Sequence, residues 1–313
     1  MVQKKKFLVL IALPLLVVGY AASEYYSSQK SSQAPTSKNF DIDSWDFESF
    51  NKVEIKNSSQ SEGPITAELI KGKWKLTSPI SDVANTSKVK SFTKDLFYKP
   101  LVLVDAKSPD WSQFGFNDKS LTLNMDIAQK NLNFIVSKEP AFDGRAYVKQ
   151  NDSLYTGAAN WLALYNKNMS VFRDFTINRY WVKPNNIIFK SEGKNLSILK
   201  VDNLWKLEAG KPADKVNQEK VKAAINGLTL LLASQIVSEN KSIDSLKNYG
   251  LDKEKFSITL KGDSEKVLNL KFSESYDGKT YVVSSLREVI FEVLTPTVSR
   301  WDLSAKDLID VKN

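Results

Sequence analysis

The strongest constraint on how this chain folds is an internal repeat. Five short groups of residues occur twice in the same order, and the two occurrences always lie 131–135 residues apart. A fixed period of this kind is the sequence signature of a structural unit that is present more than once. We therefore expect two tandem copies, at residues 46–177 and 178–313. The repeated groups are Trp74-Lys75-Leu76 with Trp205-Lys206-Leu207; Asp82, Asn85 and Lys88-Val89-Lys90 with Asp214, Asn217 and Lys220-Val221-Lys222; Phe114-Gly115-Phe116 with Tyr249-Gly250-Leu251; Gly144 and Tyr147-Val148 with Gly278 and Tyr281-Val282; and Arg173-Asp174-Phe175 with Lys306-Asp307-Leu308.

The patterns within each copy predict an α+β unit. In the first copy, residues 65–77 read as a hairpin that turns at Lys71-Gly72, and a helix capped by Asn85 or Thr86 follows. Residues 121–127 alternate apolar and polar side chains, which is typical of an antiparallel strand. Each copy is thus expected to be a mainly antiparallel sheet with one main helix packed on it. The helices are assigned the apolar stripes Val89, Phe92, Leu96 and Phe97 in the first copy and Val221, Ala224, Ile225, Leu228, Leu231 and Leu232 in the second, and the second copy repeats the hairpins at 195–207, around Asp202-Asn203, and at 256–272.

Composition narrows the chemistry. The chain has no cysteine and no histidine, which excludes disulfides, zinc sites built on Cys or His, thiol nucleophiles and imidazole bases. The formal net charge is +8, but only five of the 44 basic residues are arginine, and the lysines are spread among Asp and Glu. Proteins that read nucleic acids rely on Arg for bidentate contacts. We therefore expect no nucleic-acid partner.

The first 24 residues predict a membrane anchor. Lys4, Lys5 and Lys6 precede an uncharged, mostly aliphatic run from Phe7 to Ser23, long enough to span about 25 Å as a helix. Two tyrosines follow at 25 and 26 and would suit the membrane interface. A cleaved signal peptide is the alternative, with Gly19-Tyr20-Ala21 as the cleavage site. In either case the bulk of the chain is expected to be exported, and residues 25–45 to form a flexible linker. We expect a single pass through the inner, cytoplasmic membrane.

Three repeated residue types are candidates for function, and each has a structural explanation. Trp74 and Trp205 fall on strands, where a large ring fills the core between sheet and helix. Asp82 and Asp214 precede a helix, where a carboxylate can accept hydrogen bonds from free amides. Gly115 and Gly250 fit a helix end with positive φ. A requirement of the fold explains a residue that is kept in both copies, so we assign all six to structure.

The other motifs lack residues that a catalytic or metal-binding site would need. Ser91 and Lys94 have the Ser-x-x-Lys spacing of penicillin-binding enzymes, but the companion motifs are absent from the sequence. Asp41, Asp43 and Asp46 lack the Gly and terminal Glu of a calcium loop. Carboxylate pairs remain an open route to glycoside hydrolysis. We assign no catalytic, cofactor-binding or metal-binding residue.

The second copy resembles a bacterial family. It carries Trp205-Lys206-Leu207, Pro212-Ala213-Asp214, a capped helix, Tyr249-Gly250-Leu251-Asp252 and Gly278 ahead of Tyr281-Val282. This order resembles the domain of unknown function 4340 family, and the first copy matches it more loosely. Lys253-Glu254 stand where that family often has Pro. The resemblance implies a membrane-anchored exported protein of the kind often encoded near gliding-type ABC transporter components, and it implies no catalytic residues.

Together these features predict a non-catalytic binding or scaffold protein of a cell-envelope assembly, with an ABC transporter as a candidate partner. Exposed sheet edges would offer strand addition to such a partner. The alternative is a carboxylate-dependent hydrolase that acts on envelope glycan. We expect no cofactor.

Overall fold

A computed structural model describes most of the chain. The residues described are 40, 49–58, 61–105, 110–127, 130–178, 183–208, 215–262, 267–298, 301 and 305–308. The predicted anchor at 1–24, nearly all of the predicted linker, the three aspartates Asp41, Asp43 and Asp46, and Asp214 lie outside these residues. Searching the described residues for a helix long and apolar enough to cross a membrane finds none.

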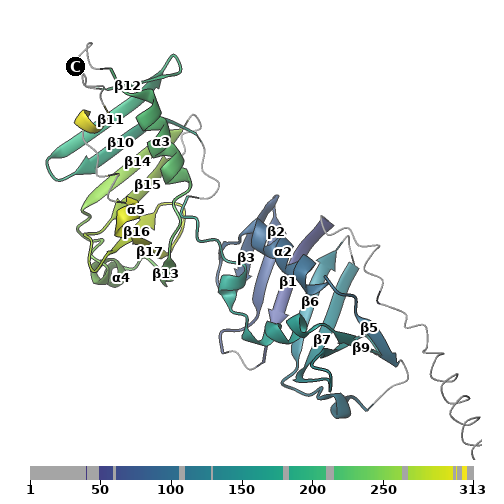
Figure 1. Ribbon diagram of the computed structural model, residues 1–313. Coiled ribbons are helices and arrows are strands. Elements are labelled where there is room, and N and C mark those ends of the chain that lie inside the picture. The colour runs from purple at the N-terminus through teal and green to yellow at the C-terminus, as the bar shows by residue number, and fades with distance from the viewer. Residues whose placement is uncertain are drawn as a thin grey trace, which may run out of the picture. The chain divides into compact units, whose positions relative to one another are not determined.

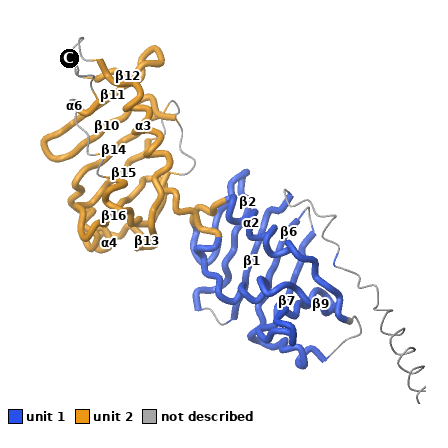
Figure 2. Tube along the Cα trace, viewed as in Figure 1, with its two compact units in different colours: residues 1–81, 86–171 blue, residues 82–85, 172–313 orange. Residues whose placement is uncertain are grey.

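The chain forms two compact units, which Figure 2 distinguishes by colour. Unit 1 is drawn from residues 1–81 and 86–171, and unit 2 from residues 82–85 and 172–313. The division after residue 171 comes earlier than the predicted boundary at 177/178. The reason is that the intervening segment bonds to unit 2, where Ile177 N–H donates to Leu231 O at 2.9 Å.

Unit 1 is an antiparallel sheet with the helix α2 across one face (Figure 1). Its strands lie in the order β3-β2-β1-β6-β7-β8-β9-β5. The elements are β1 (Phe50–Lys56), β2 (Ile65–Ile70), β3 (Lys73–Ser78), α2 (Thr86–Leu96), β5 (Val102–Asp105), the 3-10 helix η2 (Trp111–Phe114), β6 (Leu121–Ile127), β7 (Lys130–Pro140), β8 (Ala146–Gln150), β9 (Ser153–Gly157), and the 3-10 helices η3 (Ala159–Asn166) and η4 (Met169–Val171).

Unit 2 has the same construction, with α3 across one face of its sheet (Figure 1). Its strand order is β12-β11-β10-β14-β15-β16-β17-β13. Apart from the two-residue strand β4, this order is position by position that of unit 1, and the connections along the chain also correspond. The elements are β4 (Asp82–Val83), β10 (Pro184–Ser191), β11 (Lys194–Val201), β12 (Leu204–Leu207), α3 (Gln218–Thr229), β13 (Gln235–Ser238), α4 (Ile243–Asn248), β14 (Phe256–Gly262), β15 (Val267–Phe272), β16 (Lys279–Ser284), β17 (Ile290–Leu294), α5 (Thr295–Val298) and α6 (Ala305–Leu308).

The predicted turns and strand faces are present. Lys71 and Gly72 have φ of 51° and 73°, and Asp202 and Asn203 have φ of 50° and 64°. Two consecutive positive φ values make the two-residue turn that matches the twist of a hairpin. In β6 every second side chain is buried, as the alternating pattern predicts.

Most residues of the two predicted apolar stripes are buried or partly buried. All four residues of the stripe predicted for the first copy are buried, although the last, Phe97, lies one residue beyond α2. Asn217 caps α3 by accepting from Lys220 N–H at 2.9 Å. The prediction was wrong for Leu232, which is 60% exposed. Because α3 ends at Thr229, residues 231–233 are extended and their side chains alternate. Leu231 therefore points inward and Leu232 outward.

Phe40 extends unit 1 into the predicted linker. Its ring centroid lies 5.7 Å from that of Phe134 and 5.6 Å from that of Tyr155, and its N–H donates to Leu101 O at 3.0 Å. Edge-to-face ring contacts of this kind stabilise a core beyond their buried area. Phe40 is thus part of unit 1, ahead of the predicted start at residue 46.

Candidate functional site

The repeated tryptophans are core residues. Trp74 on β3 is 2% exposed and Trp205 on β12 is 9% exposed. The Trp74 ring packs at 5.4 Å from the ring of Phe50, and Trp205 lies in the apolar core of unit 2. Neither ring is available as a platform on which a ligand could stack.

The repeated glycines hold a turn beside a pair of aromatic rings. Gly115 and Gly250 have φ of 75° and 65°, a region that favours glycine. The ring of the aromatic residue before each glycine contacts the ring of the tyrosine in the next repeated group. Phe114 lies 5.1 Å from Tyr147, and in unit 2 the corresponding rings of Tyr249 and Tyr281 lie 4.8 Å apart. Two repeated groups that are distant in sequence therefore contact each other in each unit.

Asp82 does not cap a helix, contrary to the prediction; it is the centre of a buried ionic cluster in unit 2. Its carboxylate accepts two hydrogen bonds from Arg287, at 2.8 and 2.6 Å, and one from Arg173 Nε at 2.7 Å. The other face of Arg173 donates to both oxygens of Glu239 at 2.7 Å. The side chains of Asp82, Arg173 and Arg287 are only 3–4% exposed, whereas that of Glu239 is 42% exposed.

This cluster keeps Asp82 ionised. Burial acts to raise the pKa of the carboxyl, but the hydrogen bonds and charges of Arg287 and Arg173 and the Val83 N–H outweigh it and lower the pKa below its ordinary value. Burial likewise opposes the charge of Arg173, and Glu239 and Asp82 raise its pKa. Guanidinium groups suit such sites because their planar donors match carboxylates two at a time. The scarcity of arginine among so many lysines was the sequence signal that could have pointed to these positions.

A short backbone ladder brings Asp82 to the cluster. Asp174 N–H donates to Val83 O at 3.0 Å, and Asn85 N–H donates to Phe172 O at 2.7 Å. In the second copy, Asn217 N–H makes the corresponding bond to Leu308 O at 2.8 Å. This bond matches Phe172 with Leu308, both buried. The fifth repeated group was therefore aligned in the wrong register, because the sequence comparison placed Leu308 opposite Phe175.

A second buried carboxylate lies on β17 and is fully bonded. Glu292 accepts from Ser234 Oγ and from Gln235 Nε2, each at 3.0 Å, and its Oε2 lies 3.2 Å from Lys279 Nζ. Burial raises its pKa, but the Gln235, Lys279 and Ser234 hydrogen bonds outweigh that effect and lower it. Within the described ranges, no three His, Cys, Asp or Glu side chains gather as a metal site would require.

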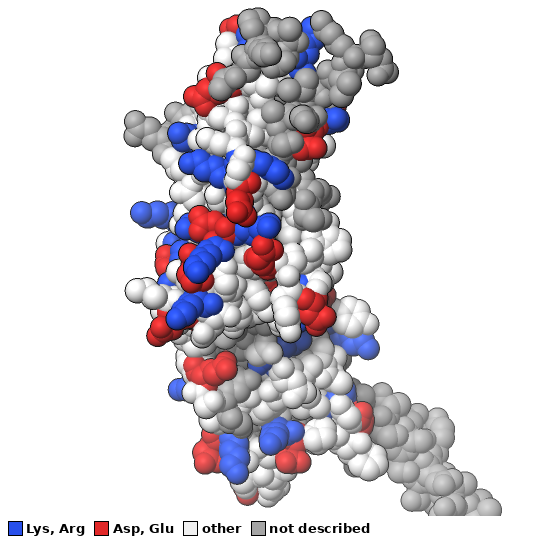
Figure 3. Space-filling model, turned by 90° about the vertical axis from the view of Figure 1, so that its left-hand side faces the viewer, with Lys and Arg blue, Asp and Glu red and all other residues white. Residues whose placement is uncertain are grey.

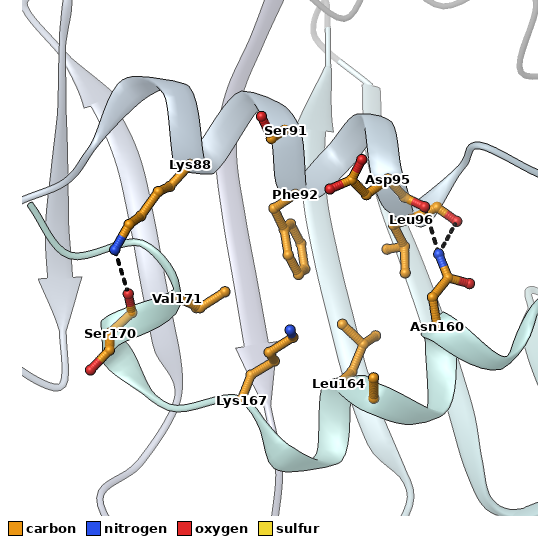
Figure 4. Close-up of a pocket in the computed structure, with 11 residues that line it drawn as sticks. Lys88, Ser91, Phe92, Asp95, Leu96, Asn160, Leu164, Lys167, Ser170 and Val171 are labelled. Atoms are coloured by element: carbon orange, nitrogen blue, oxygen red, sulfur yellow. Dashed lines mark hydrogen bonds between the residues drawn. The ribbon is translucent and has the colours of Figure 1, made fainter.

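Unit 1 holds a groove between α2 and the 3-10 helices η3 and η4, with a volume of about 420 Å³. Figure 4 shows Lys88 reaching across to Ser170 O, at 3.2 Å, and Asn160 donating to the last carbonyls of α2, the shorter bond being 2.5 Å to Asp95 O. Asn160 Oδ1 is buried and accepts no hydrogen bond from the described residues. The lining residues are Lys88, Ser91, Phe92, Asp95, Leu96, Asn160, Ala163, Leu164, Lys167, Ser170 and Val171.

Only one of the two residues of the Ser-x-x-Lys motif lines the groove. Ser91 lines it, whereas Lys94, although on the same helix, is not one of the lining residues. The sequence predicts neither a role for Ser91 nor the presence of the groove. Only the packing of η3 and η4 beside α2 creates this concave surface.

The comparisons with known proteins give one result. The family model "Domain of unknown function (DUF4340)" matches residues 74–242. No curated protein and no solved structure matches the chain. The matched range begins at β3 of unit 1 and ends at the start of α4 in unit 2, so it contains Asp82, Arg173 and Glu239 but not Arg287. Because the match covers more than half of the residues, the chain belongs to the DUF4340 family.

Proposed function

We propose that this chain is a non-catalytic, membrane-anchored, exported protein that binds or organises components of a cell-envelope assembly, with an ABC transporter as the candidate partner. The observation that carries the proposal is the groove of unit 1. It is concave, has an apolar floor that includes Phe92 and Leu164, and has lysine and serine side chains at its rim. A site of this composition is typical of ligand and peptide recognition.

The anchor and the duplication belong to the same proposal. The basic flank at Lys4–Lys6 and the apolar run that follows it favour insertion with the bulk of the chain outside the cytoplasm. The common strand order of the two sheets supports a tandem duplication of one unit. Apart from Asp214, which lies outside the described residues, the first four repeated groups fall on corresponding elements, which also favours this origin.

The alternative, a carboxylate-dependent hydrolase, receives less support. Asp82 and Glu239 bind the same guanidinium, that of Arg173, and so form one candidate carboxylate pair. A glycosidase needs one carboxyl that keeps its proton until it protonates the leaving group. Asp82 is buried and its pKa is lowered, so it holds no proton to donate near neutral pH.

Purification of the full chain from solubilised membranes tests the proposal. We expect envelope proteins to co-purify with the parent and with Lys94→Trp, and to be lost with Ser91→Trp. The first substitution adds a large ring outside the groove, and the second fills it. Both positions are exposed on α2, so both variants should fold and melt like the parent. A parent chain that retains no partner, or a glycan-cleaving activity that Asp82→Asn abolishes, would overturn the proposal.

A further inference from the structure

Each unit carries an exposed aromatic ring at the tip of the same hairpin. Phe142 lies between β7 and β8, and Tyr276 lies between β15 and β16; their residues are 108% and 80% exposed. The surrounding sequences are Phe142-Asp143-Gly144-Arg145 and Tyr276-Asp277-Gly278-Lys279. The two glycines belong to one of the repeated groups, and the aromatic residue two positions earlier extends that group.

The other repeated residues of these hairpins have roles inside their own unit. Gly144 and Gly278 have φ of 76° and 71°. Asp143 accepts from Arg145 N–H at 3.1 Å, and Asp277 at φ 48° forms the two-residue turn with Gly278. Further along, Val148 and Val282 are completely buried. Turn geometry and core packing therefore account for the repeated Asp, Gly and Val residues, but not for the aromatic one.

No contact among the described residues explains the exposed rings of Phe142 and Tyr276. Neither side chain makes a ring contact or a hydrogen bond with the described residues, and turn chemistry favours Asp, Asn, Gly, Ser and Pro rather than aromatic residues. A single exposed apolar side chain needs no explanation. The same type of ring at the same tip in both units calls for a contact outside the chain.

We propose that the Phe142 and Tyr276 tips are twin anchors that insert into apolar pockets of a protein partner. This inference rests on the proposed binding function and adds a contact surface separate from the groove. The charges at the tips favour a protein over an anionic lipid surface. Arg145 is paired with Asp143 at 2.6 Å and Lys279 with Glu292 at 3.2 Å, so their positive charges are already countered. Acidic and basic residues are also interspersed on the face that Figure 3 shows.

The repetition defines the partner further. Two tips with the same chemistry fit a partner that presents the same pocket twice, that is, two copies of one protein. An aromatic ring on a short turn is an effective anchor because it brings a large contact area and loses little conformational freedom on binding. Two linked contacts also raise the overall affinity beyond that of either contact alone.

Photo-crosslinking in native membranes is the first test. The full chain would carry p-benzoylphenylalanine at position 142, 276 or, as a control, 243. Ile243 is 83% exposed at the start of α4 and is not part of either tip. We expect positions 142 and 276 to yield an adduct with one and the same protein, and position 243 to yield none. Adducts with lipid only, with two different proteins, or no adduct would overturn the inference.

Affinity measurements with that purified protein form the second test. Phe142→Ser and Tyr276→Ser should each weaken binding roughly tenfold or more, as loss of an interface anchor does. The double variant should weaken binding further, and Ile243→Ser should bind like the parent. Thermal melts should not change, because neither ring is buried. If the tip variants bind normally while Ser91→Trp does not, the tip inference fails and the proposed function stands. If the parent chain binds no partner, both the tip inference and the proposed function are wrong.

Discussion

The two units have one strand order but complete their cores with different chemistry. In unit 1, the rings of Phe97, Phe134 and Trp161 contact one another at 5.2–5.6 Å between centroids. In unit 2, buried charged side chains include Arg287 and Glu292, whereas the described residues of unit 1 bury no charged side chain to that extent. The shared order depends on alternating apolar residues and turns, which both units have. The other buried side chains can therefore differ between the two units.

One edge of the sheet in unit 2 is bonded to the helix of that unit. In unit 2, the side-chain amide of Gln218 on α3 accepts from Trp205 N–H at 2.8 Å and donates to Trp205 O at 2.9 Å. These two bonds occupy the free side of β12 and work against strand addition at that point. The corresponding helix position of unit 1 is Thr86, which is too short to do the same. Strand addition, expected from the sequence as a binding mode, is therefore disfavoured at β12.

The largest expected effect tests what the units share. Trp74→Ala and Trp205→Ala should each lower the unfolding free energy of the unit concerned by about 3–5 kcal/mol, because truncation removes packed surface and leaves a cavity. Trp74 is the more buried residue and should give the larger loss. Thermal melts and urea titrations of the full chain measure both, with the 72% exposed Tyr98→Ala as control. Normal melting combined with a lost partner would mark the tryptophan as a contact residue.

The next effect tests what separates the units. Asp82→Asn should destabilise unit 2 by about 3 kcal/mol, because it leaves buried arginines without their counter-charge. Asp143→Asn is the matched control, since Asp143 pairs with Arg145 at the surface of unit 1 and exposed pairs contribute little. Denaturant titrations followed by tryptophan fluorescence would compare the two. Equal, small losses would show that the ionic cluster does not stabilise unit 2.

Two glycines that correspond in sequence should differ in their response to alanine. Both substitutions incur the cost of a positive φ, about 1–3 kcal/mol for such backbone strain. At Gly115 the added Cβ would also lie 2.6 Å from Ser137 Oγ and 2.8 Å from Glu139 Cβ, whereas at Gly250 the nearest atom is 3.8 Å away. We expect Gly115→Ala near the upper end of that range and Gly250→Ala near the lower end. Melting curves that fall by the same amount would contradict the close approach.

The smallest effect depends on pH. The folded-state pKa of Asp82 is lowered, below its unfolded value of about 4. The unfolded state therefore binds the proton first, so the stabilisation is present above about pH 4 and is lost as the pH falls through the folded-state pKa. The stability gap between the parent and Asp82→Asn should narrow in acid. A gap that stays constant from pH 6 to pH 3 would show that Asp82 does not titrate in this way.

Much of the fold could be read from short-range patterns. Alternating side chains, positive-φ turns such as Lys71-Gly72 and the capped helix of the second copy are local features, so they predict elements without knowledge of their neighbours. The first strand of each unit was not predicted. β1 and β10 nevertheless lie inside their sheets, between β2 and β6 and between β11 and β14. Strand order is a long-range property that no local pattern contains.

The sequence by itself determined that Cys and His chemistry is absent, and it predicted two units of one construction whose repeated tryptophans and glycines serve the fold. These conclusions need residue identity and spacing only. The tertiary structure alone decided that Asp82 meets Arg287, 205 residues away, and that α2 and η3 enclose a groove. It also decided that Phe142 and Tyr276 are exposed. Burial and pairing are set by contacts between distant segments, so the same Asp that could cap a helix becomes instead the centre of an ionic cluster.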